Sequence, residues 1–310
     1  MRFTLRNRGL GVRIPPGVLS LFASANRSQV SLCSAGPNQM ARPAEKQPKS
    51  FLEFVEIVDA YQSKAQESLW FRGCGDHTHS LRPTLYRHKR VSSLKDLSAL
   101  EQNLMTRFRQ RSIPFHSRPL SDDWDVLFFM QHYGIPTRLL DWTENPFVGL
   151  YFAVMSARFT TSPSGRIKFT KDAAVWIVNP VKWNQHSLSH QSFDGGVCTS
   201  SSEELKGYSP GRDLAKANKY PVCIYGAHNS PRIVAQRGVF TVFGQDTTSM
   251  ESIYSAAGFP NECLVKVVLK RRYLPAIRKA VLFHGTTESV VFPDLDGLAK
   301  ELKRDFEFEV

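Results

Sequence analysis

The chain has 310 residues, of which 42% are hydrophobic and 11% aromatic, so it can bury a substantial core. A single α/β-type domain of about 200–250 residues is ordinary, and this length fits one such domain. No apolar run approaches the roughly 18–20 residues that a membrane-spanning helix needs, so we expect a soluble, cytoplasmic protein without a membrane partner. The formal net charge of +12 permits attraction to the phosphates of nucleotides or nucleic acid, although no dense Lys/Arg run is present.

The cysteines and histidines do not form a pattern typical of a metal site. Five cysteines lie far apart and include no C-x-x-C pair. This pattern argues against a disulfide framework or a zinc site and fits a reducing compartment. His77 and His79 lie beside Asp76, but no further ligand cluster accompanies them, so we interpret them as part of a solvated loop. We therefore expect no bound metal.

The first 49 residues differ from the rest in composition. Up to residue 50 there are eight Lys or Arg and one acid. The apolar run in residues 18–25 is short for a targeting peptide. Residues 11–15 read Gly-Val-Arg-Ile-Pro, like the translated 3′ end of a tRNA gene, so we expect translation to begin near Met40. We therefore expect residues 1–49 to be an extension and linker, disordered or wrongly included in the reading frame, and residues 50–310 to be the globular domain.

The first half of the chain is predicted to be mainly helical. Ser50 and Glu53 have the spacing of a capping box, and apolar side chains follow them at helical intervals. A short apolar run over residues 69–71, ended by glycines, predicts a strand. Asn145 followed by Pro146 is typical of a helix N-terminus. Further helices are predicted over residues 97–108, 123–133 and 147–155.

The second half is predicted to be richer in strands. Apolar runs predict strands over residues 173–178 and 263–269, and a strand pair or bulge around 233–243. Residues 184–221 are rich in Ser, Gly, His and Lys and are interpreted as a long surface excursion. Helices around 274–281 and 296–303 close the chain. A helical first half and a strand-rich second half predict a single α+β domain with a mixed sheet.

Phe71, Arg72 and Gly73 form the first candidate for chemistry. Arg72 is expected at the end of a strand, beside a glycine that allows backbone to approach a ligand closely. An arginine side chain offers a planar fork for a phosphate or a carboxylate. The alternative is a surface arginine at a turn.

Residues 131–143 read Gln-His-Tyr-Gly-Ile-Pro-Thr-Arg-Leu-Leu-Asp-Trp-Thr and gather polar and aromatic side chains around a Gly-x-Pro turn. Leu139 and Leu140 are expected to be buried, but the polar side chains cannot all share a buried apolar face. Either the segment presents polar groups to a ligand, or a buried Arg–Asp pair within it only fixes the architecture. His132 is a general base or a cap of helix carbonyls. The other polar residues concerned are Thr137, Arg138, Asp141 and Thr143.

These segments resemble the FRG domain, a family named for its Phe/Tyr-Arg-Gly motif. The resemblance rests on residues 70–73, 81–87, 131–143, 145–146 and 150–153, and continues more weakly through residues 232–240 and 292–297. Gly149 stands where the family more often has alanine. The family occurs often in bacterial and phage genomes. With the tRNA-like segment, this implies a bacterial protein of a prophage or genomic island, acting as a mobile-element or anti-phage effector, but no particular reaction.

The chain also shows a more distant similarity to arginine-type ADP-ribosyltransferases. In that family a strand ending in Arg-Gly holds the phosphates of NAD, a second strand carries a Ser/Thr motif, and a third carries a glutamate. Arg72 and Gly73 match the first element, and residues 140–143 match the second. The third would lie in residues 232–240, which contain no glutamate. The carboxylate that the developing positive charge requires would come from Asp141, Glu203 or Glu204.

Two functions remain open from the sequence. The first is an enzyme with an ADP-ribosyltransferase-like nucleotide site, for which NAD is the candidate cofactor. The second is a non-catalytic module that binds or senses a nucleotide or nucleic acid through aromatic stacking and arginine forks. The oligomeric state is not predicted. The candidate catalytic residues are Arg72, His132, Asp141 and Thr143. The candidate ligand-binding residues are Phe71, Gly73, Arg87, Gln131, Tyr133, Thr137, Arg138, Trp142, Arg232 and Gln236.

Overall fold

The computed structural model describes residues 42–65, 67–116, 119–120, 122–162, 167–227 and 230–308. The chain divides into two units, Met1–Gln39 and Met40–Val310, and every described residue belongs to the second unit. The expectation about residues 1–39 therefore lies outside the described residues. Part of the predicted linker at 41–49 is instead a strand, because Ala44–Lys46 pairs with Val265–Val267 at a sheet edge.

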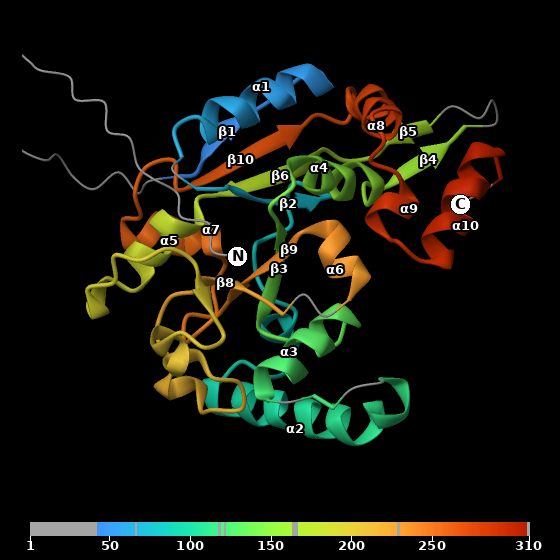
Figure 1. Cartoon of the computed structure of the whole chain (residues 1–310). Coiled ribbons are helices and arrows are strands. Elements are labelled where there is room, and N and C mark those ends of the chain that lie inside the picture. The colour runs from blue at the N-terminus through green and yellow to red at the C-terminus, as the bar shows by residue number, and fades with distance from the viewer. Residues whose placement is uncertain are drawn as a thin grey trace, which may run out of the picture. The chain divides into compact units, whose positions relative to one another are not determined.

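A mixed sheet forms the centre of the described unit (Figure 1), which is the predicted α+β fold class. Its strand order is β1-β10-β6-β2-β3-β9-β8-β7; the β1–β10 and β7–β8 pairs are parallel and the others antiparallel. A separate antiparallel pair, β4 and β5, lies outside this sheet. The strands are β1 (Ala44–Lys46), β2 (Trp70–Cys74), β3 (Leu139–Thr143), β4 (Phe159–Thr161), β5 (Ile167–Phe169), β6 (Ala173–Val178), β7 (Cys198–Thr199), β8 (Val222–Tyr225), β9 (Gly238–Val242) and β10 (Leu264–Leu269).

The sheet is almost divided in two between β2 and β3. These neighbours share a single residue pair, Phe71 with Thr143, whereas β2–β6 and β3–β9 each share five. In Figure 1 the strands β10, β6 and β2 lie roughly along one line, and β3, β9 and β8 cross that line steeply. The strands thus diverge beside the one shared pair.

Helices cover both faces of the sheet and meet it through separate groups of buried side chains. Helices α1, α4 and α8 pack with β2, β6 and β10, and α2, α5 and α7 pack with the tryptophan-rich opposite side. Helix α3 packs with β3, β8 and β9. The α-helices are α1 (Phe51–Gln62), α2 (Leu94–Ser112), α3 (Asp123–His132), α4 (Pro146–Met155), α5 (Pro180–Ser187), α6 (Pro231–Gln236), α7 (Met250–Ala257), α8 (Leu274–Phe283), α9 (Glu288–Val291) and α10 (Leu295–Asp305). Short 3-10 helices are η1 (Leu85–Arg87), η2 (Ile113–Phe115), η3 (Ser189–Gln191), η4 (Glu203–Tyr208) and η5 (Leu214–Lys216).

The helix starts read from the sequence are largely confirmed. The Ser50 side chain accepts a hydrogen bond from the Glu53 backbone N–H at 3.1 Å, and Asn145 caps α4 with Pro146 at its first position. The Glu53 carboxylate accepts from the Lys49 backbone N–H rather than from Ser50. In the described part of the chain, no helix is both long enough and apolar enough to cross a membrane.

Two segments of the second half differ from their predictions. The first residues of the predicted strand pair at 233–243 form helix α6, and only Gly238–Val242 is a strand. Pro231 at the first turn and Ser230 at the cap favour the helix, and Arg237 in the left-handed region ends it. The predicted surface excursion at 184–221 contains the fully buried Tyr208 and the edge strand β7, so much of it is part of the core.

Candidate functional site

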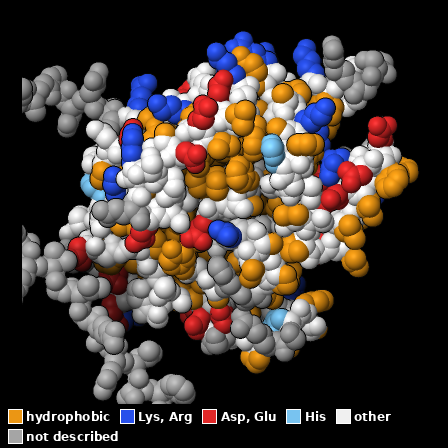
Figure 2. Space-filling view, turned by 45° about the horizontal axis from the view of Figure 1, so that its top comes forward, with side chains coloured by type: hydrophobic (Ala, Val, Ile, Leu, Met, Phe, Trp, Pro, Cys, Tyr) orange, Lys and Arg blue, Asp and Glu red, His pale blue; other side chains and the backbone are white. Residues whose placement is uncertain are grey.

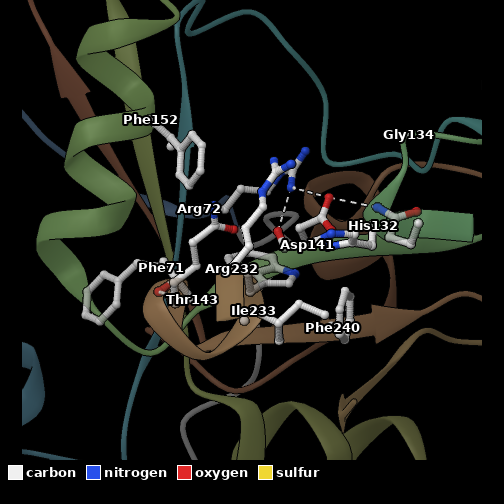
Figure 3. A pocket seen from close by; sticks show the side chains of 15 residues that line it. Phe71, Arg72, His132, Gly134, Asp141, Thr143, Phe152, Arg232, Ile233 and Phe240 are labelled. Atoms are coloured by element: carbon white, nitrogen blue, oxygen red, sulfur yellow. Dashed lines mark hydrogen bonds and ion pairs between the residues drawn. The ribbon is translucent and has the colours of Figure 1, made fainter. Parts of the chain in front are cut away.

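A cavity of about 320 Å³ opens beside the point where β2 and β3 diverge (Figure 3). Its walls come from β2, β3 and β9 and from helices α3, α4 and α6. Ten of the fourteen predicted site residues line it. The lining residues are Phe71, Arg72, Gly73, Gln131, His132, Gly134, Asp141, Trp142, Thr143, Phe152, Arg232, Ile233, Gln236, Gly238 and Phe240.

Arg72 leaves β2 and reaches across the opening to β3. Its Nη1 donates a hydrogen bond to the backbone carbonyl of Asp141 at 2.5 Å and lies 3.6 Å from Asp141 Oδ2. The Arg72 side chain is 25% exposed and the Asp141 side chain 55% exposed. This pair is therefore open to solvent, unlike a buried ion pair that only fixes architecture. Part of the guanidinium remains available to a ligand.

A short chain of hydrogen bonds fixes the Asp141 carboxylate. Gln131 Nε2 donates to Asp141 Oδ2 at 2.8 Å. The Thr137 hydroxyl in turn donates to Gln131 Oε1 and accepts from the Leu139 backbone N–H. Thr137 is 1% exposed, so it does not line the cavity and instead orients the glutamine.

His132 lies at the C-terminal end of α3, beside Asp141 and Arg232 in Figure 3. Partial burial lowers the pKa of His132, and the positive charge of Arg232 lowers it further, while Asp141 acts in the opposite direction. A histidine with a pKa below its usual 6.5 is mainly neutral at pH 7. His132 can therefore accept a proton inside the cavity at neutral pH.

Thr143 and Gln236 hold the floor of the cavity together. The Thr143 hydroxyl donates to the Gln236 carbonyl at 2.5 Å and accepts from the Asn145 backbone N–H at 3.0 Å. Gln236 Nε2 donates to the Val291 carbonyl at 3.0 Å, which ties α6 to α9. Both side chains thus have structural partners, although both residues line the cavity.

The residues on either side of Arg72 position it. Phe71 is 1% exposed and belongs to the core between the sheet and α4. A Cβ on Gly73 would lie 2.0 Å from the Gly149 carbonyl oxygen and 2.4 Å from the Ala153 nitrogen. Glycine is therefore the residue that lets α4 approach β2 this closely. The Phe-Arg-Gly sequence thus combines an anchor, a partly exposed arginine and a close helix contact.

Trp142 forms the other buried support. It is 3% exposed, and its Nε1 donates to the Thr241 hydroxyl at 3.2 Å. Because that N–H is occupied inside the core, Trp142 supports β3 more than it offers a stacking face.

Four predicted residues lie outside the cavity lining, and Arg138 needs a correction. Arg138 is 1% exposed and its Nε lies 3.0 Å from the buried Glu101 carboxylate. It also donates to the carbonyls of Tyr208 and Ser209. A ligand cannot reach it, so the predicted ligand-binding role is wrong and its role is to join α2 to the core. The alternative of a buried Arg–Asp pair within residues 131–143 is thus not what forms, because the buried partner of Arg138 is Glu101 of α2.

The remaining predicted residues, Arg87 and Tyr133, are exposed near the cavity. Tyr133 is 62% exposed and its ring contacts those of Phe129 and His132. Arg87 donates to the Thr84 hydroxyl at 2.9 Å. Partial burial lowers the pKa of Arg87, and the positive charges of Arg72 and Arg82 lower it further.

Several apolar residues that line the cavity were not predicted from the sequence. Phe152, Ile233 and Phe240 line the cavity, and each looked like an ordinary core residue in its helix or strand pattern. Their contact with the cavity depends on how α4, α6 and β9 meet, which no local pattern records. The only signal was their closeness in sequence to the polar candidates.

Asp141 is the single carboxylate among the residues that line the cavity. Glu203 and Glu204 begin η4 and do not line it, so they cannot supply the expected carboxylate here. Among the described residues no group of three or more His, Cys, Asp or Glu could hold a metal ion. Asp76 instead binds Lys171 and Thr78, and these hydrogen bonds hold its pKa well below the usual range.

Comparison with known proteins supports the resemblance given by the motifs. The family model of the FRG domain matches residues 67–161, which include β2, α3, β3 and α4 around the cavity. No curated protein and no solved structure matches the chain. The matched residues contain Phe71-Arg72-Gly73 and the whole 131–143 segment. The chain therefore contains an FRG domain, at residues 67–161.

Proposed function

We propose that the cavity between β2 and β3 binds a nucleotide, with NAD as the first candidate, and that Arg72 binds its phosphates. The observation that carries this proposal is a partly exposed arginine in a cavity with a second arginine, Arg232, and only one carboxylate. Arginine is the side chain best suited to phosphate, because its planar fork can bind two oxygens. The charges of Arg87 and Arg72 influence each other, so Arg87 adds to the positive potential that a phosphate would meet.

The size of the cavity limits what it can hold. Small-molecule pockets run from about 300 to 1,000 Å³, and this one, at about 320 Å³, is near the lower end. It suits one nucleoside phosphate unit. The second nucleoside of NAD would then extend along the surface toward Arg87.

An ADP-ribosyltransferase-like reaction is the chemistry that this arrangement supports best. The bond between ribose and nicotinamide breaks, the electron pair leaves with nicotinamide, and positive charge develops on the ribose. The Asp141 carboxylate would stabilise that charge. Water or an acceptor nucleophile then forms the new bond to the ribose and loses a proton, which neutral His132 can accept.

Binding without turnover is the second candidate, and one observation favours it. The Asp141 carboxylate is already engaged by Gln131 at 2.8 Å and by Arg72 at 3.6 Å. A carboxylate held by two partners is less available to a ribose. In this case the cavity senses a nucleotide or the end of a nucleic acid strand and releases it unchanged.

Nicotinamide release from NAD separates the two candidates. The enzyme candidate predicts release by the unaltered chain and a loss of roughly 10²-fold in Asp141→Asn, the scale of removing one transition-state contact. Binding of NAD without any release supports the sensing candidate. Salt-sensitive binding of a single-stranded oligonucleotide that is weakened in Arg72→Ala would extend the sensing candidate from nucleotides to nucleic acid. The exposed Glu203→Gln is the matched control and should leave each readout unchanged.

An effector role is proposed as the biological setting, because the 11–15 segment resembles a tRNA gene end and such genes are integration sites. Induced expression in a bacterial host tests it. Growth arrest by the unaltered chain, relieved in Arg72→Ala, is the expected result. Equal growth of both strains at equal protein levels contradicts it.

A further inference from the structure

Helix α10 is packed with its apolar side outward. Its only buried residue is Gly297, and the half-buried Glu301 and Arg304 follow on the same side at helical spacing. The leucines of the helix, and Phe306 at its C-terminal cap, lie on another face. An ordinary surface helix has the opposite arrangement, with its apolar stripe toward the core.

Polar contacts fix this orientation. A Cβ on Gly297 would lie 2.0 Å from the Phe292 carbonyl oxygen, so only glycine allows the close approach to the end of α9. Arg304 Nε donates to both oxygens of the buried Glu288 carboxylate, at 3.0 and 3.1 Å. The Glu301 carboxylate accepts from the Ser289 backbone N–H at 2.9 Å. The helix is therefore held by three points on one face.

The outward face of α10 is a continuous apolar stripe. Leu295, Leu298, Leu302 and Phe306 are 82%, 43%, 47% and 72% exposed. Their spacing of three and four residues places them in a row over the whole helix. Figure 2 shows hydrophobic side chains on this edge of the molecule, where α10 lies. A row of this kind marks an interaction surface more than an ordinary scatter of exposed side chains.

We propose that the stripe binds the same stripe of a second copy of this chain, as an antiparallel helix pair about a two-fold axis. Such an interface uses one surface twice, so it must be complementary to itself. With the axis near Lys300, Leu295 of one copy meets Phe306 of the other. Leu298 and Leu302 form the centre.

The charges beside the stripe have this self-complementarity. Asp296 and Lys303 lie on the same flank, seven residues apart, and neither side chain has an ion pair or hydrogen bond among the described residues. In an antiparallel pair the acidic end of one flank faces the basic end of its copy. Asp296 of each chain then meets Lys303 of the other, which gives two equivalent ion pairs. Charges beside an apolar seam set the partner and the orientation in this way.

A membrane surface is a poorer occupant. Helices that lie on anionic membranes are rich in Lys and Arg on the polar face. Helix α10 has three acidic residues (Asp296, Glu301, Asp305) and three basic ones (Lys300, Lys303, Arg304), so it carries no net charge.

A single helix of this length covers less than the roughly 800 Å² per partner of a standard interface. The dimer should accordingly be weak and concentration-dependent.

Sedimentation of the full chain over a concentration series tests the dimer. The unaltered chain should move from monomer toward dimer as concentration rises, and Leu298→Glu with Leu302→Glu should stay monomeric. These positions are exposed, so the melting temperature should not change. Leu52→Glu is the matched control, since Leu52 is 69% exposed on α1, and it should dimerise like the unaltered chain. A monomer at every concentration, or a dimer that survives both glutamates, overturns the proposal.

Charge reversal tests the antiparallel arrangement. Asp296→Lys alone places lysines opposite each other, and Lys303→Asp alone places aspartates opposite each other. Each should raise the dimer dissociation constant roughly tenfold, because the two-fold axis counts every change twice. The double variant restores opposite charges and should return to near the unaltered value. If the double variant instead dimerises more weakly than either single variant, the proposed pairing is overturned. Binding of anionic phosphatidylserine vesicles by the monomer through the stripe would overturn it as well.

Discussion

Arg72 and Asp141 contact each other at the mouth of the cavity, yet each keeps part of its side chain exposed. Arg138 and Glu101 form the opposite kind of pair, with 1% exposure on both sides. Arg72 lies in β2 and Arg138 directly precedes β3, but the two arginines have different roles. Exposure separates an arginine that can exchange its partner for a ligand from one that cannot.

The buried pair predicts a large stability effect. Arg138→Met leaves the Glu101 carboxylate buried without its cation, which typically costs about 3–5 kcal/mol of unfolding free energy. Denaturant unfolding followed by circular dichroism measures it. Arg87→Met at an exposed position is the control and should stay within about 0.5 kcal/mol. A loss below about 1 kcal/mol in Arg138→Met would contradict the structural role of the pair.

The environment of His132 predicts opposite pKa changes in two variants. Arg232→Gln removes a nearby positive charge that disfavours the imidazolium, so the pKa of His132 should rise. Asp141→Asn removes a carboxylate that favours it, so the pKa should fall. NMR titration of the His132 ring protons measures both. Changes of the same sign in the two variants would show that His132 is not between these charges.

The same shift has a consequence for stability against pH. Because the folded-state pKa of His132 is lowered, the unfolded chain binds its proton first as pH falls. The neutral form of His132 therefore contributes to the free energy of unfolding. This stabilisation is complete above about pH 6.5 and is lost as the pH falls toward the folded-state pKa. Comparing the pH dependence of unfolding in His132→Gln with the unaltered chain checks it. The variant should lose less stability across that window, and an unchanged profile would contradict the assignment.

At the scale of elements, the contact between β2 and α4 is the tightest support of Arg72. Gly73→Ala puts a methyl group against backbone atoms of α4 at 2.0 and 2.4 Å, so the strand and the helix must separate. Overpacking usually costs about 1–3 kcal/mol, and we expect the upper end because backbone cannot turn away. Gly196→Ala is the control, since its nearest neighbour is a flexible Glu67 side chain at 3.4 Å. Equal stability in both variants would contradict the close packing.

Much of the element map could be read from local signals. Ser50, Asn145 and Pro146 mark helix starts, and the apolar run at 173–178 is the whole of β6. Helix α6 was missed because its apolar residues are also typical of a strand. The buried parts of 184–221 were missed because short 3-10 turns and a two-residue strand leave no periodic pattern.

The candidate site was predicted in part for a physical reason. Phe71-Arg72-Gly73 and the 131–143 segment carry residue types that are costly to bury without a purpose, so sequence alone marked them. Which of them face the cavity depends on strand alternation and on the divergence of β2 from β3. Arg138 and Asp141 are close in sequence, yet one is in the core and the other is at the cavity, and no local rule separates them.

At the scale of the whole described unit, the weak β2–β3 junction divides the sheet at the cavity. The junction has one residue pair, against six in β6–β10. Backbone amides of β3 should therefore exchange with solvent faster than those of β6 in the free protein. A nucleotide that bridges Arg72 and β3 should slow β3 exchange without changing β6. Hydrogen exchange by mass spectrometry measures both, and equal protection of the two strands in the free protein would contradict a weak junction.

Calorimetric titration with NAD and ADP-ribose is the most direct test of the central claim, which is nucleotide binding by Arg72 in this cavity. The account predicts saturable binding by the unaltered chain and a loss of affinity of roughly tenfold or more in Arg72→Ala, because a charge-assisted phosphate contact is removed. Arg90→Ala, at an exposed position away from the cavity lining, should bind as the unaltered chain does. The absence of binding by the unaltered chain, or equal affinity in Arg72→Ala, would contradict it.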